Sequence, residues 1–149
     1  MKKIFFALAA FSFSSLSESA PTDSIDGLWM LEQDHTVIEI QTKGDSVEGV
    51  IFSRPAGKKN EVDKFNPTPE LRNRSILGLR VLENLKNTKV GYWKGGRIYD
   101  PDSGSFYSAQ ARLKDSETLI VRGYIAIPLF GRTAVLKRYQ GKSLPLSLE

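Results

Sequence analysis

The side chains that most often carry out catalysis are scarce in this sequence. Its 149 residues include one histidine and no cysteine, which excludes a thiol nucleophile and the usual zinc ligand sets. The histidine, His35, lies in a polar Asp-His-Thr turn between two predicted strands, whereas a general base is normally a held, partly buried imidazole. We therefore expect His35 to be an exposed turn residue and not part of a Ser-His-Asp triad.

Carboxylates are the remaining catalytic option. Glu39, Glu48 and Asp100 lie on or beside predicted strands, and we expect all three side chains to face water. A hydrolase that uses carboxylates would need two of them to face each other within a pocket. No pattern in the sequence indicates such a pair. We predict no catalytic residue and no enzyme, and a carboxylate hydrolase stays as the third hypothesis.

The segment 100–104 (DPDSG) resembles the first residues of a calcium-binding loop. The full pattern D-x-[DN]-x-[DN]-G-x5-E is not completed, however. Proline early and glycine late instead predict a type I turn followed by a left-handed glycine. We therefore expect neither a metal site nor a cofactor.

Short β-rich runs with turn residues between them are typical of hairpin-linked strands. Residues 76–86 fit both a strand and a helical turn; we favour a strand passing into a turn, with a further turn at Gly95-Gly96. The other predicted strands are Gly27–Glu32, Val37–Gln41, Val47–Phe52, Arg97–Asp100, Phe106–Leu113, Thr118–Tyr124 and Arg132–Arg138.

These runs predict one all-β domain over residues 20–138. About eight hairpin-linked strands must stack as two sheets or close into a barrel, because open edges invite aggregation. We favour a single up-and-down antiparallel β-barrel, which needs only short connections. Residues 54–75, with three prolines and many charges, predict a long surface loop, and residues 139–149 predict a loosely held tail.

The first 19 residues have the pattern of a secretory signal peptide. Lys2 and Lys3 precede an apolar run from Ile4 to Phe13, which is too short for a membrane-spanning helix of roughly 20 apolar residues. We place the cleavage after Ser19 and expect a periplasmic or secreted protein; a buried N-terminal helix is the alternative. The net charge of +4 is scattered along the chain, which argues against a nucleic-acid-binding surface.

Five strings in the sequence resemble a known family. In chain order they are GLW, ILGLRVLENLK, GGRIYDPDSGSFY, LIVRGYI and FGRT. They are similar to those of small exported bacterial proteins catalogued as a domain of unknown function with a lipocalin-like (calycin) barrel. The resemblance spans residues 27–138. Many relatives carry cysteines in the middle loop and a tryptophan near the end of the last strand, where this chain has no cysteine and reads Val135-Leu136.

The resemblance also implies how one end of the barrel is closed. Lipocalins in the broad sense carry Gly-x-Trp on the first strand and an arginine near the end of the last. Here these are Gly27, Trp29 and Arg138, with Arg122 as an alternative partner. A guanidinium stacked on the indole would close the barrel floor while keeping its charge near solvent.

Small residues on two strands predict a cavity inside the barrel. An eight-stranded barrel is either filled by side chains or holds one small ligand, and Ala109, Ala111 and Gly123 remove volume where a solid core would need it. Small residues also serve close strand packing, which is the alternative explanation. The residues expected to share inner faces are Tyr107, Ala109, Ala111, Leu113, Leu119, Val121 and Gly123.

We predict an exported soluble carrier or sensor of a small apolar or amphipathic molecule, such as a fatty acid. Aromatic residues near strand ends would line the mouth, and an arginine or tyrosine would hold a carboxylate head. The alternative is an envelope-accessory or protein-interaction module with a filled barrel, binding a partner through residues 54–75 and the tail; an exposed apolar patch would favour it. The predicted ligand-binding residues are Tyr92, Trp93, Tyr107, Arg122, Tyr124, Phe130 and Arg132.

Overall fold

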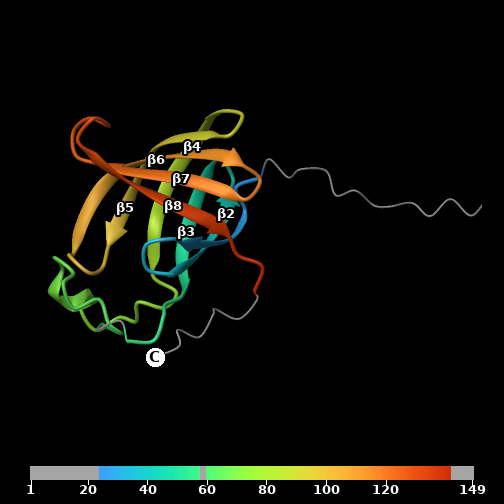
Figure 1. Cartoon of the computed structure of the whole chain (residues 1–149). Helices are drawn as coiled ribbons and strands as arrows, with labels where there is room; N and C mark the ends of the chain where they lie inside the picture. Colours follow the sequence, from blue (N-terminus) through green and yellow to red (C-terminus); the bar gives the residue numbers. More distant parts are fainter. Residues whose placement is uncertain (1–23, 58–59, 142–149) are drawn as a thin grey trace, which may run out of the picture.

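The computed structural model describes residues 24–57 and 60–141. The predicted signal peptide, residues 1–19, and most of the predicted tail therefore lie outside the described residues. The described chain forms eight strands that pair antiparallel in sequence order, and the last strand returns to the first to close a barrel (Figure 1). The strands are β1 (Gly27–Leu31), β2 (Val37–Lys43), β3 (Ser46–Ser53), β4 (Arg80–Lys89), β5 (Tyr92–Asp100), β6 (Ser105–Asp115), β7 (Thr118–Tyr124) and β8 (Gly131–Arg138).

This closed, all-β, up-and-down barrel confirms the predicted fold class. Two local predictions are wrong. Residues 76–86 run from a turn into a strand and not from a strand into a turn: the turn lies at Leu77-Gly78, and β4 begins at Arg80 and continues to Lys89. The hairpin turn to β5 lies at Val90-Gly91. The predicted turn at Gly95-Gly96 lies inside β5 instead.

Close strand packing explains the two glycines in β5. Gly95 has a φ of +75° and lies at an irregularity in the β5–β6 register, where a residue without a Cβ bends the strand. Gly96 is needed for space, because a Cβ there would lie 2.4 Å from the carbonyl oxygen of Glu83 and 2.8 Å from Cγ of Leu85. A glycine pair that reads as a turn in the sequence therefore marks a bulge and a close contact.

One end of the barrel is closed, as predicted, by Trp29 and Arg138. The Arg138 guanidinium lies 4.2 Å from the centroid of the Trp29 ring, and the buried indole Nε1 donates to the carbonyl oxygen of Ile25 at 2.8 Å. Arg138 also donates from Nε to the Ser116 carbonyl (2.7 Å) and from Nη1 to the Asp26 carbonyl (3.0 Å). This plug ties the start of β1, the β6–β7 turn and the end of β8 together.

The half of the barrel next to this plug is filled by side chains. Ala109 and Ala111 lie in this filled half and do not open a cavity, so the prediction fails for these two residues. The prediction fails because side chains of neighbouring strands fill the space. Ala111 lies opposite Trp93, and Ala109 lies opposite Gly96, over which the Leu85 side chain packs. The buried apolar residues of this cluster include Trp29, Ile40, Val47, Leu85, Trp93, Leu119 and Leu136.

The long loop, residues 54–75, is tied to the barrel by a buried polar cluster. Asp63 is fully buried and accepts hydrogen bonds from Tyr99 on β5, from Asn66 Nδ2 (2.8 Å) and from Arg74 Nε (2.9 Å). Burial first, and then the bond to Asp63, raise the pKa of Tyr99 to about 12. Beyond one short 3-10 helix, Pro69–Leu71, the described part of the loop is irregular, as predicted.

Candidate ligand site at the barrel mouth

The barrel is open at the end opposite the Trp29–Arg138 plug. The cavity there has a volume of about 1010 Å³, at the upper limit of sites that hold one small molecule. Its inner wall is largely apolar and comes from β1, β5, β6, β7 and β8. The residues on this wall include Leu31, Ile98, Tyr107, Val121, Gly123 and Ala134. The barrel is thus filled in one half and hollow in the other.

A smaller recess adjoins this cavity on the side of β2, β3 and the long loop. It has a volume of about 220 Å³ and shares Leu31, Asp34, Ile98 and Asp100 with the main cavity. Its wall is again mainly apolar. The residues specific to it include Thr36, Ile38, Ile51, Arg54, Val81 and Asp102.

The structure brings four of the seven predicted ligand-binding residues together at this mouth. Tyr107, Tyr124, Phe130 and Arg132 all line the main cavity. Tyr107 and Gly123 are on the inner face, as the strand alternation predicted, whereas Phe130 is 69% exposed at the rim. These four therefore form one continuous edge from β6 to β8.

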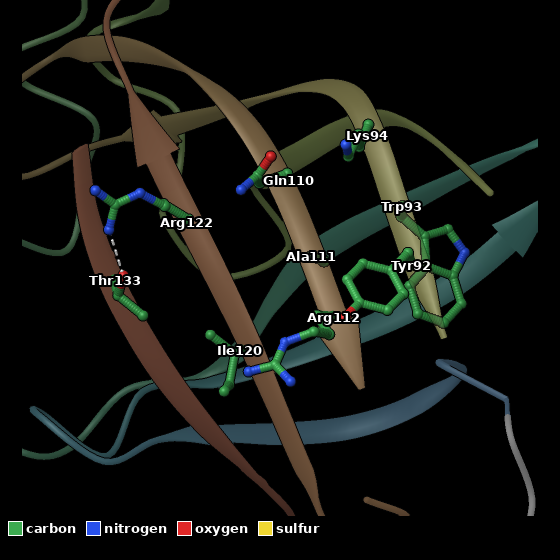
Figure 2. Close-up of a pocket in the computed structure, with 9 residues that line it drawn as sticks. All are labelled: Tyr92, Trp93, Lys94, Gln110, Ala111, Arg112, Ile120, Arg122 and Thr133. Atoms are coloured by element: carbon green, nitrogen blue, oxygen red, sulfur yellow. Dashed lines mark hydrogen bonds between the residues drawn. The ribbon is translucent and has the colours of Figure 1, made fainter. Parts of the chain in front are cut away.

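The other three predicted residues lie elsewhere. Figure 2 shows a groove of about 290 Å³ along β5 to β8, and all three of these residues, Tyr92, Trp93 and Arg122, line it. Trp93 is 5% exposed and belongs to the filled half of the barrel. Arg122 donates to Thr133 Oγ1 (2.7 Å) and to the Pro128 carbonyl (2.6 Å), so it fixes the β7–β8 turn and is not the arginine that stacks on the floor tryptophan.

Sequence reasoning missed several residues of the mouth. Two of them follow from strand pairing: Ile98 lies opposite Tyr107, and Ala134 lies opposite Val121. Residues opposite each other in paired strands point to the same face, so knowledge of the pairing would have placed Ile98 and Ala134 on the inner face. Arg54 follows the end of β3, in a loop where no periodicity marks it. The sequence contains no signal that would have brought Arg54 to the cavity.

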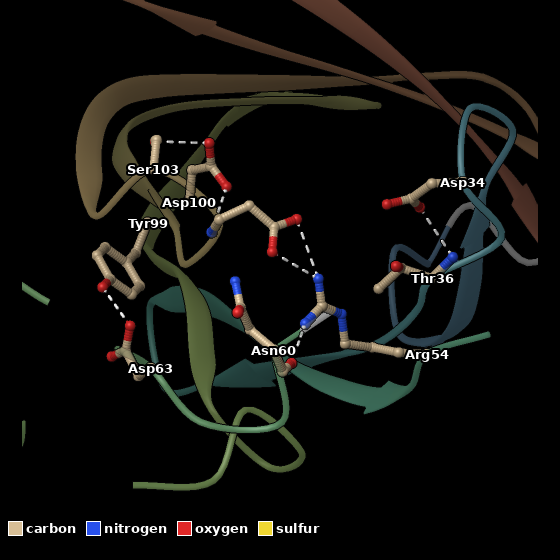
Figure 3. Close-up of polar contacts among 9 residues, drawn as sticks. Asp34, Thr36, Arg54, Asn60, Asp63, Tyr99, Asp100 and Ser103 are labelled. Atoms are coloured by element: carbon tan, nitrogen blue, oxygen red, sulfur yellow. Dashed lines mark hydrogen bonds and ion pairs between the residues drawn. The ribbon is translucent and has the colours of Figure 1, made fainter. Parts of the chain in front are cut away.

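Two carboxylates face the mouth, and both serve local turns. Asp34 accepts from the Thr36 N–H (2.9 Å). Asp100 accepts from the Asp102 N–H (3.0 Å) and from Ser103 Oγ (2.7 Å) (Figure 3). The predicted turn at 100–104 is confirmed, with Gly104 at a φ of +72°. Both carboxylates therefore contribute to turns at the rim of the mouth.

The other candidate catalytic residues lie outside the mouth. His35 is exposed in its turn, as predicted. Glu48 pairs with Arg80 at 3.5 Å, and Glu39 accepts from Gln41 Nε2 at 2.7 Å. Within the described residues, no three His, Cys, Asp or Glu side chains cluster to hold a metal ion, and no helix there is both long and apolar enough to span a bilayer.

An apolar turn projects from the rim of the cavity. The β7–β8 connection, residues 125–130, carries four strongly exposed large apolar residues and no charged residue. Soluble proteins seldom expose such a group together without a binding role. The four are Ile125 (66% exposed), Ile127 (47%), Leu129 (77%) and Phe130 (69%).

Comparisons with known proteins agree with this architecture. The family model described as "Uncharacterized protein conserved in bacteria (DUF2147)" matches residues 27–138, which confirms the resemblance predicted from the sequence strings. No curated protein matches the sequence. Among solved structures, the chain is similar to protein HP1028 from the human pathogen Helicobacter pylori, described as belonging to the lipocalin family. The two are 24% identical with a TM-score of 0.72, covering 79% of this chain and 84% of that one; this likeness shows the fold.

Proposed function

The chain belongs to the DUF2147 family of bacterial proteins, and from this premise we propose that it binds one small apolar or amphipathic molecule with a fatty-acid-like chain. The ligand lies in the hollow half of the barrel and enters through the mouth. The observation that carries the proposal is the contrast between the two halves: one end is plugged and filled, while the other leaves about 1010 Å³ between largely apolar walls. Burial of an alkyl chain there would gain roughly 0.8 kcal/mol per CH₂ group.

The proposal is for a binding protein that acts after export, and not for an enzyme. Export is supported by the charged and apolar pattern of residues 1–19. A non-catalytic role is supported by the turn-capping use of the mouth carboxylates Asp34 and Asp100. A carrier needs only apolar walls and a few orienting polar groups.

A titration with N-phenyl-1-naphthylamine, an uncharged dye that fluoresces in apolar sites, tests the proposal. We expect saturable binding at one site per chain. Ala134→Trp, which places a large side chain on the cavity wall, should abolish it. Ser108→Trp is the matched control, because Ser108 is exposed on β6 and lines none of the mouth. Equal binding by the wild type and Ala134→Trp, or no binding at all, would refute the site.

A protein-interaction role is the second candidate, and the exposed turn 125–130 favours it. Replacing Leu129 and Phe130 by serine separates the two functions, because both side chains are mainly exposed and their loss should leave the barrel folded. The carrier proposal expects the dye to bind with nearly unchanged affinity at equilibrium. If the protein instead binds a partner through this turn, a protein that co-purifies with the wild type should be lost from this variant, whether or not the dye binds.

A further inference from the structure

The apolar turn between β7 and β8, residues 125–130, extends beyond the neighbouring strand. β8 pairs with β1 only from Leu136 to Arg138, so the beginning of β8 and the turn before it continue past the end of β1 (Figure 1). Leu129 and Phe130 line the cavity and are both strongly exposed. The turn therefore lies beside the mouth with its largest apolar side chains in solvent.

The backbone of this turn is bonded within its own hairpin. Every carbonyl of the turn except that of Ala126 accepts a hydrogen bond there. Two of these bonds come from Arg122, whose Nε donates to the Pro128 carbonyl at 2.6 Å and whose Nη2 donates to the Leu129 carbonyl at 3.3 Å. The others come from the N–H groups of Ile125, Ile127 and Phe130. Because hydrocarbon offers no hydrogen-bond partner, this internal bonding favours burial of the turn in a lipid layer.

The composition of the turn favours a lipid surface over a protein partner. Its sequence, Ile-Ala-Ile-Pro-Leu-Phe, contains no polar side chain. Protein interfaces surround their apolar centre with polar groups and form about one hydrogen bond per 100–200 Å². This turn offers no side-chain donor or acceptor for such bonds, whereas the acyl chains of a bilayer require none.

Unmatched positive charge lies at the base of the turn. Arg132 follows the turn directly and is exposed, and the hydrogen bonds of Arg122 within the described residues all go to uncharged oxygens. The groove of Figure 2 continues from Arg122 along the barrel, and its lining includes Arg112 and Lys94 but no carboxylate. Apolar residues with cations beside them are typical of segments that lie at the surface of an anionic bilayer.

The carboxylates of the mouth belong to other turns. Asp34 accepts a hydrogen bond within the β1–β2 turn, and Asp100 accepts two within the β5–β6 turn. Neither carboxylate lines the groove that contains the cations. The β7–β8 side of the mouth is therefore the side that complements an anionic surface.

We propose that residues 125–130 dock the protein on a phospholipid bilayer that contains anionic lipids. The apolar side chains enter the boundary of the acyl chains, and Arg122 and Arg132 lie among the headgroup phosphates. The cavity mouth then opens at the lipid surface, so an apolar ligand passes between bilayer and barrel without crossing water. Docking goes beyond the proposed function and does not need its ligand, whereas this transfer rests on it.

Co-sedimentation of the full chain with vesicles tests the docking. We expect binding to vesicles of phosphatidylcholine mixed with phosphatidylglycerol, and weaker binding to phosphatidylcholine alone. The double variant Leu129→Ser/Phe130→Ser should lower the partition coefficient at least about tenfold, because two large apolar side chains no longer leave water. Arg132→Gln should lower it about fivefold, for the mixed vesicles only, since one arginine near an anionic surface contributes that much.

Val90→Ser is the matched control. Val90 is an apolar residue that is 81% exposed, but it lies in the β4–β5 turn, whose Gly91 carbonyl accepts from the Leu113 N–H of β6 near the plugged end. This variant should bind both vesicles as the wild type does.

A second measurement detects insertion directly. In Leu129→Trp, the added indole should fluoresce at shorter wavelength on vesicles and be quenched by phosphatidylcholine brominated on its acyl chains. Val90→Trp should show neither effect. The native Trp29 and Trp93 are buried, so they remain outside the bilayer in both variants.

Three results would overturn the inference: no binding to the mixed vesicles, binding that the double serine variant retains, or no quenching in Leu129→Trp. Self-association that the double serine variant abolishes, without vesicle binding, would assign the turn to a second copy of the chain instead. N-phenyl-1-naphthylamine separates this inference from the proposed function. The double serine variant should still bind the dye, and a wild type that binds vesicles but no dye would refute the ligand site alone.

Discussion

Two arginines at opposite ends of the barrel each hold separate segments of the chain together through several hydrogen bonds. At the closed end, Arg138 uses Nε, Nη1 and Nη2 to bind three carbonyl oxygens, at 2.7, 3.0 and 3.0 Å, while its plane stacks on Trp29. At the open end, Arg54 uses Nη1 to bind the Asn60 carbonyl and Nη2 to bind the Asp102 carboxylate. Since a guanidinium is rigid and always charged, Arg138 closes the floor of the barrel, and Arg54 ties the start of the long loop to the β5–β6 turn.

At the same scale, Tyr99 predicts a pH dependence of stability. Burial raises the pKa of Tyr99 to about 12, above the ordinary value of roughly 10 for an unfolded chain. Between these values the unfolded state has lost the proton and the folded state keeps it, so the free energy of unfolding falls as pH rises from about 10 to about 12. Below pH 10 this contribution is fully present.

Tyr99→Phe tests the assignment by urea unfolding at several pH values. The variant should be less stable at neutral pH by about 1 kcal/mol, because Asp63 loses one hydrogen bond. It should also lose part of the alkaline decrease that the wild type shows. An unchanged alkaline profile in Tyr99→Phe would contradict the role given to Tyr99.

Among the elements, β5 depends most on glycine. Gly96→Ala would place a Cβ 2.4 Å from the Glu83 carbonyl oxygen and 2.8 Å from the Leu85 backbone nitrogen, so β4 and β5 must separate. We expect a loss of about 2–4 kcal/mol, in the range of severe core substitutions. The neighbouring Gly95→Ala has no atom within 4 Å and meets only the strain of its φ of +75°, about 1 kcal/mol.

Chemical denaturation of the two variants measures this difference. The control is internal, because the substitutions are identical in chemistry and adjacent in sequence. Gly96→Ala should unfold at a clearly lower urea concentration than Gly95→Ala. Equal midpoints, or a larger loss for Gly95→Ala, would show that the β4–β5 contact is not as close as described.

The elements also show what the sequence could predict. From Tyr107 to Leu113, β6 alternates between apolar and polar residues, and polar turns bound β6 and β7, so their limits and the inner face of β6 were predictable. The first half of β5 was not, because Lys94, Gly95 and Gly96 show no alternation and are held as a strand by the neighbours β4 and β6. The anchoring of the long loop was equally hidden, since the buried Asp63 reaches the barrel through Tyr99 on β5, 36 residues further along the chain.

At the scale of the whole molecule, the division into a filled and a hollow half is the basis of the proposed function. The sequence predicted a cavity from small residues, but cavity volume depends on what the opposite and neighbouring strands contribute. Leu85 and Trp93 fill the space beside Ala109 and Ala111. Gly123 and Ala134, near the mouth, line the cavity instead. Four of the seven predicted site residues line this mouth. They could be predicted because turn residues in the sequence mark the ends of strands, whereas no such signal marks positions inside a strand.

Amide chemical shifts recorded during a titration with N-phenyl-1-naphthylamine test the central claim most directly. We predict shifts at the mouth, centred on Leu31, Ile98, Val121 and Ala134, with Trp29 and Leu85 in the filled half nearly unaffected. Shifts confined to the outer groove around Tyr92 and Arg112, or no shifts at all, would contradict the account.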